Sequence, residues 1–354
     1  MREPYQDLDA AIEERRRRRA HRRRMLYLRR TLLVVCAALL LALLIATPFW
    51  IIDGLRSHQA PQVEEDSTVT TASQTTAPTQ PPFPYVDAST LSLEGKIAST
   101  YAVLLDVTEG RVVAARNADV RANPASITKV MTLLVAVENI EHLDTPYTMS
   151  WKIIDPPYKE QASTTGLETG ETVTLLDLLY GCILPSGADA TAALADYVAD
   201  HEADYDPQDE ATFAAMMNQR AAQLGATNTH FTNSSGLHDP EHKTTAMDMA
   251  LIMAEAMKNP VCRQVLMAKE YRFPSTPQHP EGLLQVSTAF RHIGGQDTCI
   301  LAGKTGYTDQ AMNTLVTYAK IDGHEYVFVA MYGNGSDQVL EDTHKVYREF
   351  CGWQ

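Results

Sequence analysis

Apolar and polar positions alternate in two parts of the chain, which predicts β-strands there. Residues 101–107 alternate and are rich in β-forming side chains, residues 108–110 form a turn, and residues 111–115 return, so we expect a β-hairpin. Strand signals also dominate four stretches towards the C-terminus: residues 285–290, 299–302, 312–320 and 325–332. Between the last two, Asp322 and Gly323 are residue types that a tight hairpin turn requires.

The segments between these strands repeat apolar residues at helical spacing. We expect helices over residues 126–139, 174–183, 188–199, 207–224 and 244–257, and a closing helix over residues 337–349. Thr174 and Asp177 fit the cap and the third position of the second helix. Residues 141–173 are irregular, with short strands. This order predicts an α/β fold of the α+β type, in which an antiparallel sheet is flanked by helices and a helical cluster is inserted.

Charge is unevenly spread along the chain. Within a total net charge of −14, residues 1–30 carry 11 arginines and 5 acidic side chains and are therefore basic. They adjoin residues 31–52, a run of 22 uncharged and mostly apolar positions. At about 1.5 Å per residue such a helix spans a bilayer core of about 30 Å, and basic flanks stay in the cytoplasm. This position argues against interpreting the arginine runs as a nucleic-acid-binding arm.

These features predict four parts of the chain. They are a cytoplasmic Arg-rich segment (1–30), a transmembrane anchor (31–52), a Ser/Thr/Pro/Gln-rich linker (53–88) and an extracytoplasmic domain (89–354). The linker has too few large apolar side chains to bury a core, so we interpret it as a tether. A cleaved signal peptide is the alternative to the anchor, but its apolar region normally has about 7–15 residues.

Five cysteines are present, without the Cys-x-x-Cys or Cys/His spacing that holds zinc. Cys182 lies in an apolar run and is predicted to be a core residue. Cys36 falls in the predicted anchor. An oxidising exterior permits up to two disulfides among the other four cysteines, and the sequence leaves their pairing open.

A serine and a lysine stand three residues apart at the start of the first predicted helix, at Ser126 and Lys129. Residues i and i+3 share a helix face, so the Lys129 amine should lie beside the Ser126 hydroxyl. A serine hydroxyl is a weak nucleophile until a neighbour takes its proton, and a lysine shielded from water can do so because desolvation lowers its pKa. By itself, the pattern also fits a capped helix with a surface lysine.

Two further signals follow in order. Ser186 lies at a break between two predicted helices, where its hydroxyl can point into a cleft, although it could also simply cap the break. Lys304 and Thr305 lie between Gly303 and Gly306 on a predicted strand. Lysine supplies a positive charge and threonine a hydrogen bond to a carboxylate, while the glycines allow close backbone approach. The alternative for Lys304 is a solvated strand end.

Together these motifs resemble a known family. From about residue 89 to its end, the chain is similar to the serine D-Ala-D-Ala carboxypeptidases, the low-molecular-weight penicillin-binding proteins of peptidase family S11. The resemblance is carried by Ser126-x-x-Lys129, Ser186-Gly187-Ala188, Gly303-Lys304-Thr305-Gly306 and the segments 231–239 and 244–249. It implies the penicillin-binding protein/β-lactamase-like serine transpeptidase fold.

The resemblance also implies a role for each residue. Ser126 would attack the carbonyl between the two terminal D-Ala residues of a peptidoglycan stem peptide, Lys129 would take its proton, and Ser186 would pass a proton to the leaving amine. Lys304 and Thr305, within the Lys-Thr-Gly motif completed by Gly306, would hold the terminal carboxylate. The backbone N–H groups of Ser126 and Tyr307 would form the oxyanion hole. β-Lactams would acylate the same serine, with no metal or cofactor, in a single-pass protein of the bacterial cell membrane.

The sequence departs from the family pattern in three places. Ala188 replaces the usual Asn of the second motif, and Asp189 is turned about 100° from that position on a helix. The chain ends soon after Gly306, whereas many relatives carry a β-rich C-terminal domain and a C-terminal amphipathic anchor. His238 and His242 have the spacing of a metal pair, but the proline-containing segment between them favours a loop.

Three alternatives to hydrolysis of D-Ala-D-Ala remain open. A β-lactamase would need a Glu and an Asn poised for deacylation, and the nearest spacing is Glu255 and Asn259, at the end of an amphipathic helix. A non-catalytic peptidoglycan- or penicillin-binding protein is supported only by Ala188. In a transpeptidase, an amine would replace water on the same acyl-enzyme.

Overall fold

The computed structural model describes residues 83–199, 207–293 and 299–353. The predicted cytoplasmic segment, the predicted anchor and most of the predicted linker lie outside the described residues. Within the part that is described, no helix has the length and apolar character needed to cross a membrane. The four-part organisation of the chain therefore stays a prediction.

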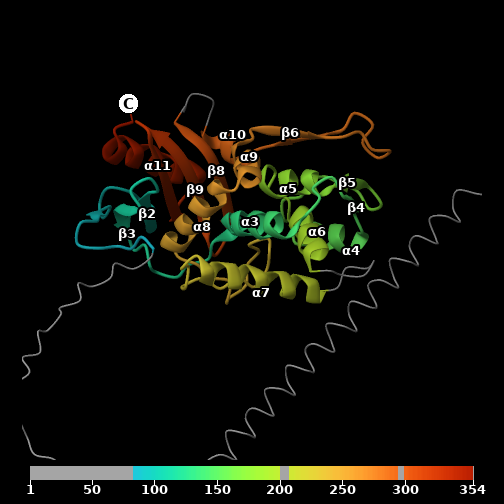
Figure 1. Cartoon of the computed structure of the whole chain (residues 1–354), viewed down its shortest axis with the longest axis horizontal. Helices are drawn as coiled ribbons and strands as arrows, with labels where there is room; N and C mark the ends of the chain where they lie inside the picture. The colour runs from blue at the N-terminus through green and yellow to red at the C-terminus, as the bar shows by residue number, and fades with distance from the viewer. Residues whose placement is uncertain (1–82, 200–206, 294–298, 354) are drawn as a thin grey trace, which may run out of the picture. The chain divides into compact units, whose positions relative to one another are not determined.

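A six-stranded sheet forms the centre of the domain (Figure 1). Its spatial order is β1 (Leu91–Ser92), β3 (Arg111–Arg116), β2 (Tyr101–Asp106), β10 (His324–Gly333), β9 (Met312–Ile321) and β8 (Ile300–Thr308). All neighbours are antiparallel except β1 and β3, which are parallel. The predicted antiparallel sheet is confirmed apart from the parallel pairing of β1 with β3, and β8 is an edge strand.

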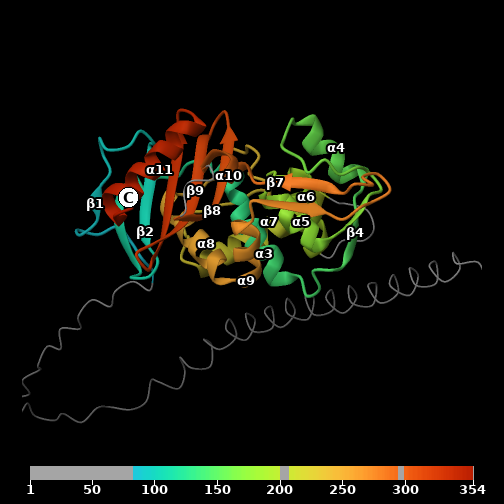
Figure 2. The same ribbon diagram turned by 90° about the horizontal axis from the view of Figure 1, so that it is seen from above.

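Both faces of the sheet are buried, and alternate side chains of a strand point into different cores. On β2, Val103 and Leu105 belong to the core shared with the helical cluster, whereas Ala102 and Leu104 belong to a second core on the other face. The second core includes residues of α10 (Thr288–Ile293) and α11 (Ser336–Cys351). Figures 1 and 2 show these two helices on one side of the sheet, with α3 and α8 on the other.

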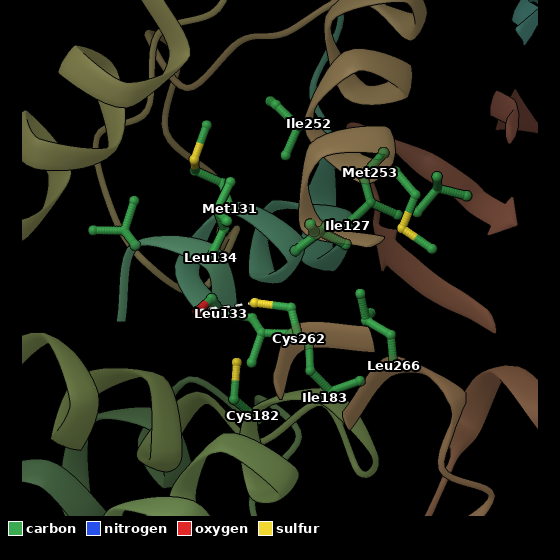
Figure 3. Packing of buried hydrophobic residues seen from close by; sticks show 14 of the residues in the cluster. Ile127, Met131, Leu133, Leu134, Cys182, Ile183, Ile252, Met253, Cys262 and Leu266 are labelled. Carbon is green, nitrogen blue, oxygen red and sulfur yellow. Dashed lines mark hydrogen bonds between the residues drawn. The ribbon is translucent and has the colours of Figure 1, made fainter. Parts of the chain in front are cut away.

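The helical cluster is built around α3 (Lys129–Asn139), whose first eight residues are all buried. A helix that is buried on every side needs neighbours all round. These are α5 (Leu175–Ile183), α6 (Ala188–Val198), α7 (Pro207–Gln223), α8 (Ala246–Lys258) and α9 (Pro260–Met267). Figure 3 shows Leu133 of α3 packed near Cys182, Ile183, Cys262 and Leu266. The prediction that Cys182 is a core residue is confirmed, since it is fully buried.

Two predicted local signals are confirmed. Thr174 and Asp177 form a reciprocal capping box at the start of α5, in which the Asp177 amide donates to Thr174 Oγ1 at 3.1 Å. Asp322 and Gly323 both have positive φ angles, of 50° and 88°, between β9 and β10. A two-residue hairpin turn of this kind favours such residues because its twist matches that of the strands.

The predicted strand over residues 285–290 is wrong in its second half. The strand β7 (Leu283–Val286) pairs with β6 (Glu270–Phe273), and the chain then enters α10. Ser287 is the reason, since its Oγ accepts a hydrogen bond from the amide of Phe290 at 3.3 Å. A serine hydroxyl that satisfies an early helical N–H favours a helix start.

Besides α10, two further helices were not expected. The irregular region contains β4 (Pro146–Thr148), α4 (Trp151–Lys159) and β5 (Thr172–Thr174). Pro156 and Pro157 lie inside α4 and hid its helical pattern. The helix α9 follows directly after α8, with the Asn259 side chain capping it and Pro260 at its first position. An Asn-Pro pair in this position is a helix-start signal that the sequence already contained.

Candidate active site

The Ser126–Lys129 pair lies where a short 3-10 turn, η1 (Ala125–Thr128), leads into α3. The α-helix therefore begins at Lys129 and not at Ser126. In a 3-10 turn, residues i and i+3 eclipse each other. The Lys129 Nζ consequently donates to Ser126 Oγ at 3.1 Å, as the spacing predicted. Ala125 has φ +50°, a strained conformation of the kind that collects at functional sites.

Lys129 is buried and held from two sides. Its Nζ also donates to the backbone carbonyl of Ser235 at 2.6 Å. Burial lowers its pKa to about 8, although the carboxylates of Asp189 and Glu210 act in the opposite direction. A lysine with this pKa is partly neutral at physiological pH, so its lone pair is available to take a proton from Ser126.

A second serine–lysine pair faces the first. Ser186, between α5 and α6, has φ +65°, and Lys304 Nζ donates to its Oγ at 2.9 Å. Lys304 Nζ also donates to the carbonyl of Thr305 at 2.8 Å. The pKa of Lys304 is well below its usual range, mainly because the side chain is buried and secondly because the charge of Lys129 repels its own. A bound carboxylate would favour its charged form again.

A cleft of about 630 Å³ brings these groups together. Its lining includes the predicted residues Ser126, Lys129, Ser186, Thr305, Gly306 and Tyr307. Lys304 lies behind this surface and reaches it through Ser186. Tyr307 is 62% exposed at the rim, and its hydroxyl donates to Asp309 at 2.9 Å.

Gly306 lets the edge strand approach the serine. A Cβ atom at this position would lie 2.8 Å from the Ser126 amide nitrogen and 2.5 Å from Thr314 Oγ1. Carbon atoms do not approach backbone nitrogen so closely without displacement. A glycine is therefore required here if β8 is to pack against η1.

Two cleft residues were missed as functional candidates. Ser235 supplies the carbonyl that holds Lys129, and its segment was recognised only by family resemblance. Thr288 shares a hydrogen bond of 3.0 Å with the hydroxyl of Thr305. The contact of Ser235 with Lys129 and that of Thr288 with Thr305 each join different segments of the chain, so local patterns do not predict them.

Ala188 lies in the wall of the cleft, two residues after Ser186 in the chain. The neighbouring Asp189 does not replace the usual Asn side chain. Its carboxylate accepts hydrogen bonds from the backbone amide of Thr165 at 3.0 and 3.1 Å, and from the Thr165 hydroxyl at 2.5 Å. Asp189 therefore anchors the loop between α4 and β5 at Thr165, and it does not itself line the cleft.

His238 and His242 do not form a metal pair. The amide of Thr232 donates to His242 Nδ1 at 3.0 Å, so its Nε2–H is left to bond Thr128 Oγ1 at 2.9 Å. Burial lowers the pKa of His242 to about 4. His238 is exposed and contacts Asn123. In the described ranges there is no group of three or more metal-ligating side chains.

Glu255 and Asn259, the pair considered for β-lactamase chemistry, make their contacts outside the cleft. Glu255 pairs with Arg220 at 2.7 Å and with Lys258 at 3.0 Å. Asn259 caps α9. Neither residue lines the cleft. Cys182, Cys262 and Cys351 are free thiols.

The chain is similar to known proteins over this same region. The sequence profile described as D-alanyl-D-alanine carboxypeptidase matches residues 87–335. The D-alanyl-D-alanine carboxypeptidase DacB2 of Mycobacterium tuberculosis is 34% identical over 233 residues, which cover 65% of this chain and 74% of the relative. DacF of Bacillus subtilis is 29% identical over 62% of this chain, but the match spans only 53% of that relative.

The fold is similar to that of solved enzymes as well. The crystal structure of the Streptomyces K15 DD-transpeptidase superposes with a TM-score of 0.65 at 26% identity, covering 73% of this chain and 98% of that one. The chain therefore belongs to the D-alanyl-D-alanine carboxypeptidase family, peptidase family S11, whose members are serine hydrolases. The predicted penicillin-binding protein fold is confirmed.

Proposed function

We propose that this chain removes the terminal D-Ala from peptidoglycan stem peptides through an acyl-enzyme on Ser126. The observation that carries the proposal is the 3.1 Å contact between Ser126 Oγ and the buried amine of Lys129. Lys129 takes the hydroxyl proton as Ser126 Oγ forms a bond to the carbonyl carbon of the penultimate D-Ala. The C–N bond to the terminal D-Ala then breaks, and a proton passes through Ser186 to the leaving amine. Water subsequently hydrolyses the ester.

The side of the cleft formed by β8 would bind the substrate. Lys304 supplies the positive charge and Thr305 a hydroxyl for the terminal carboxylate. The backbone N–H groups of Ser126 and Tyr307 would stabilise the oxyanion, and the close approach allowed at Gly306 supports this assignment. A β-lactam, which carries a strained amide and a carboxylate, would acylate Ser126 in the same way.

The location of the protein is also part of the proposal. The assembled cell-wall peptidoglycan lies outside the cytoplasm, and the apolar residues 31–52 behind an arginine-rich segment support a single-pass anchor in the bacterial cell membrane. The N-terminus would be cytoplasmic and the catalytic domain extracytoplasmic. Treating intact cells with an external protease should degrade this domain and spare residues 1–30, and protection of the domain would contradict the topology.

The test of the activity uses the purified full chain and diacetyl-Lys-D-Ala-D-Ala. We expect release of D-alanine that stops when penicillin labels the protein. Stable labelling without release would favour a non-catalytic binding role, and rapid penicillin hydrolysis would favour a β-lactamase. Absence of both release and labelling would overturn the proposal.

Transpeptidation is a second candidate, because the Streptomyces enzyme that shares this fold is named a DD-transpeptidase. The two reactions differ only in whether water or an amine attacks the acyl-enzyme. Adding glycine as an acceptor to the same assay would separate them by mass spectrometry. A carboxypeptidase yields mainly the shortened peptide, and a transpeptidase mainly the glycine adduct.

A further inference from the structure

The segment between α7 and α8 holds the turn that carries the nucleophile from one side. This segment, residues 232–242, supplies the Ser235 carbonyl that accepts a hydrogen bond from Lys129. It also passes so close to η1 that a Cβ atom at Gly236 would collide with the backbone carbonyl of Ala125. Such close packing leaves the turn no room to shift towards the segment. The shape of η1 therefore depends on a part of the chain that is distant in sequence.

His242 lies at the end of this segment and bonds both the segment and the turn. The backbone N–H of Thr232 can only donate, and it lies 3.0 Å from Nδ1 of His242. Nδ1 is therefore the acceptor, and in a neutral imidazole the proton is then on Nε2. Nε2–H accordingly donates to Thr128 Oγ1 at 2.9 Å. The side chains of Thr128 and His242 are both buried, so water cannot replace this bond.

Burial also fixes the imidazole in this state. It lowers the pKa of His242 to about 4, so the ring stays neutral at the pH at which Lys129 can act as a base. The ring of Phe231 lies beside it, with 5.4 Å between the ring centroids. The donor at Nε2 and the acceptor at Nδ1 are therefore constant under working conditions.

The turn needs external contacts because little within it fixes its shape. No side chain caps the start of η1, and its first residue has φ +50°. A 3-10 turn also has poorer hydrogen-bond geometry than an α-helix. The start of the turn is held from β9, where Thr314 Oγ1 donates to the Pro124 carbonyl at 3.0 Å. His242 holds its end, and Ser126 lies between these two anchors.

We propose that His242 is a positioning residue for acylation. By donating to Thr128, it keeps η1 in the geometry that places Ser126 Oγ beside the Lys129 amine. Neither His242 nor Thr128 lines the cleft, so the effect passes through the backbone of η1. The inference rests on the proposed function, because it assigns a role in the same acyl-enzyme reaction.

Two substitutions of His242 separate its two hydrogen bonds. In His242→Gln, the amide nitrogen reaches about as far as Nε2 and can still donate to Thr128. In His242→Asn, the amide oxygen lies near the position of Nδ1 and still accepts from Thr232, but Thr128 loses its donor. Each variant removes the ring and one hydrogen bond, so each is the control for the other.

The measurement is acylation of the full chain by a fluorescent penicillin. We expect His242→Asn to lower the acylation rate constant at saturating penicillin by about 10- to 100-fold, the range for a slightly misplaced reacting group. His242→Gln should stay within about threefold of the wild type, and penicillin binding before acylation should change by less than about threefold in both variants. Equal acylation rates in the two variants would overturn the inference, and so would a change in binding alone.

Thr128→Val removes the same bond from its other end. Valine keeps the shape of threonine without its hydroxyl, so the acylation rate constant should fall as far as in His242→Asn. The double variant should be no slower than the slower single variant, because both substitutions break one bond. Losses that multiply would mean that the two residues act independently, which contradicts the inference.

Thr317→Val is the matched control in the second core. Thr317 is also fully buried, and its hydroxyl shares a hydrogen bond of 2.8 Å with the Tyr347 hydroxyl. Its loss should lower the melting temperature as much as Thr128→Val does, but leave acylation within about twofold of the wild type. If both threonine variants slow acylation equally, the effect is one of stability and His242 has no positioning role. This comparison is decisive even if the His242 variants do not fold.

Failure of the proposed function would give a different result. If penicillin does not label the wild-type chain at Ser126, both proposals fail together. If the wild type is labelled, and His242→Asn and Thr128→Val are acylated at its rate, the proposed function stands and only the role of His242 is wrong.

Discussion

Two serine–lysine pairs face each other across the cleft, and they arise in different ways. Lys129 and Ser126 are 3.1 Å apart within a single turn of the chain. Lys304 and Ser186 are 2.9 Å apart although 118 residues separate them. The chemistry of each pair is similar, but the first is a product of local geometry and the second of tertiary packing. The surroundings of each lysine therefore decide its role.

The partners of the two lysines differ accordingly. Lys129 is held by the Ser235 carbonyl at the core end of the cleft, where burial lowers its pKa to about 8. Lys304 lies on the edge strand, beside Thr305, and is positioned for an incoming carboxylate. One lysine is suited to accept a proton and the other to bind an anion. The predictions below test this division of roles.

Replacing the nucleophile should have the largest effect. Ser126→Ala is expected to lower D-alanine release by a factor on the order of 10⁴ or more, because no acyl-enzyme can form. Labelling by fluorescent penicillin measures the same step. An unchanged melting temperature would show that the fold is intact, and persistent labelling would show that another residue is the nucleophile.

Replacing each of the two lysines should change a different kinetic parameter. Lys129→Met is expected to lower kcat by roughly 10³-fold, within the range for general bases. Lys304→Met should act mainly on KM for substrates that carry a terminal carboxylate. Amidating that carboxylate provides the control, since it should slow the wild type but have little further effect on Lys304→Met. Equal kcat losses in both variants would contradict the proposed division.

A substitution at Gly306 tests the contact between the edge strand β8 and the turn η1 that carries Ser126. Gly306→Ala should lower the acylation rate by about 10²-fold, the cost of misplacing a reacting group by about 1 Å. The reason is the 2.8 Å distance between the added Cβ and the Ser126 amide. Gly303→Ala is the comparison on the same strand, because its nearest contact is the Ile293 side chain at 3.1 Å. It should affect stability more than acylation.

The pH profile tests the lowered pKa of Lys129. Its amine must be neutral to take a proton, so kcat/KM should rise about tenfold per pH unit on the acid side and level off above about pH 8. The acylation rate by penicillin across this range gives the profile. A rate that is already constant at pH 6 would mean that Lys129 is not the base.

Ala188 should have the smallest effect on catalysis itself. Ala188→Asn is expected to preserve or raise turnover of diacetyl-Lys-D-Ala-D-Ala, with a change of at most about threefold. The polar amide can be accommodated because the position faces two cavities. A loss of 100-fold would indicate a differently built site.

Local signals in the sequence predicted much of the fold correctly. The hairpin at Asp322 and Gly323 and the cap at Thr174 depend on backbone preferences within a few residues, so they could be recognised directly. The helix α4 was missed because two internal prolines obscured it. The helix α10 was interpreted as strand because its starting signal, the Ser287 cap, is a single hydroxyl.

The contact between Ser126 and Lys129 could be read from their spacing, because residues three apart in a helical turn lie on the same face. The contacts of Lys304 with Ser186 and of Lys129 with Ser235, and the cavity beside Ala188, depend on how distant segments pack. Those contacts join segments separated by many residues. Their geometry, and the burial that shifts both lysine pKa values, exist only once the sheet edge packs against the helical cluster.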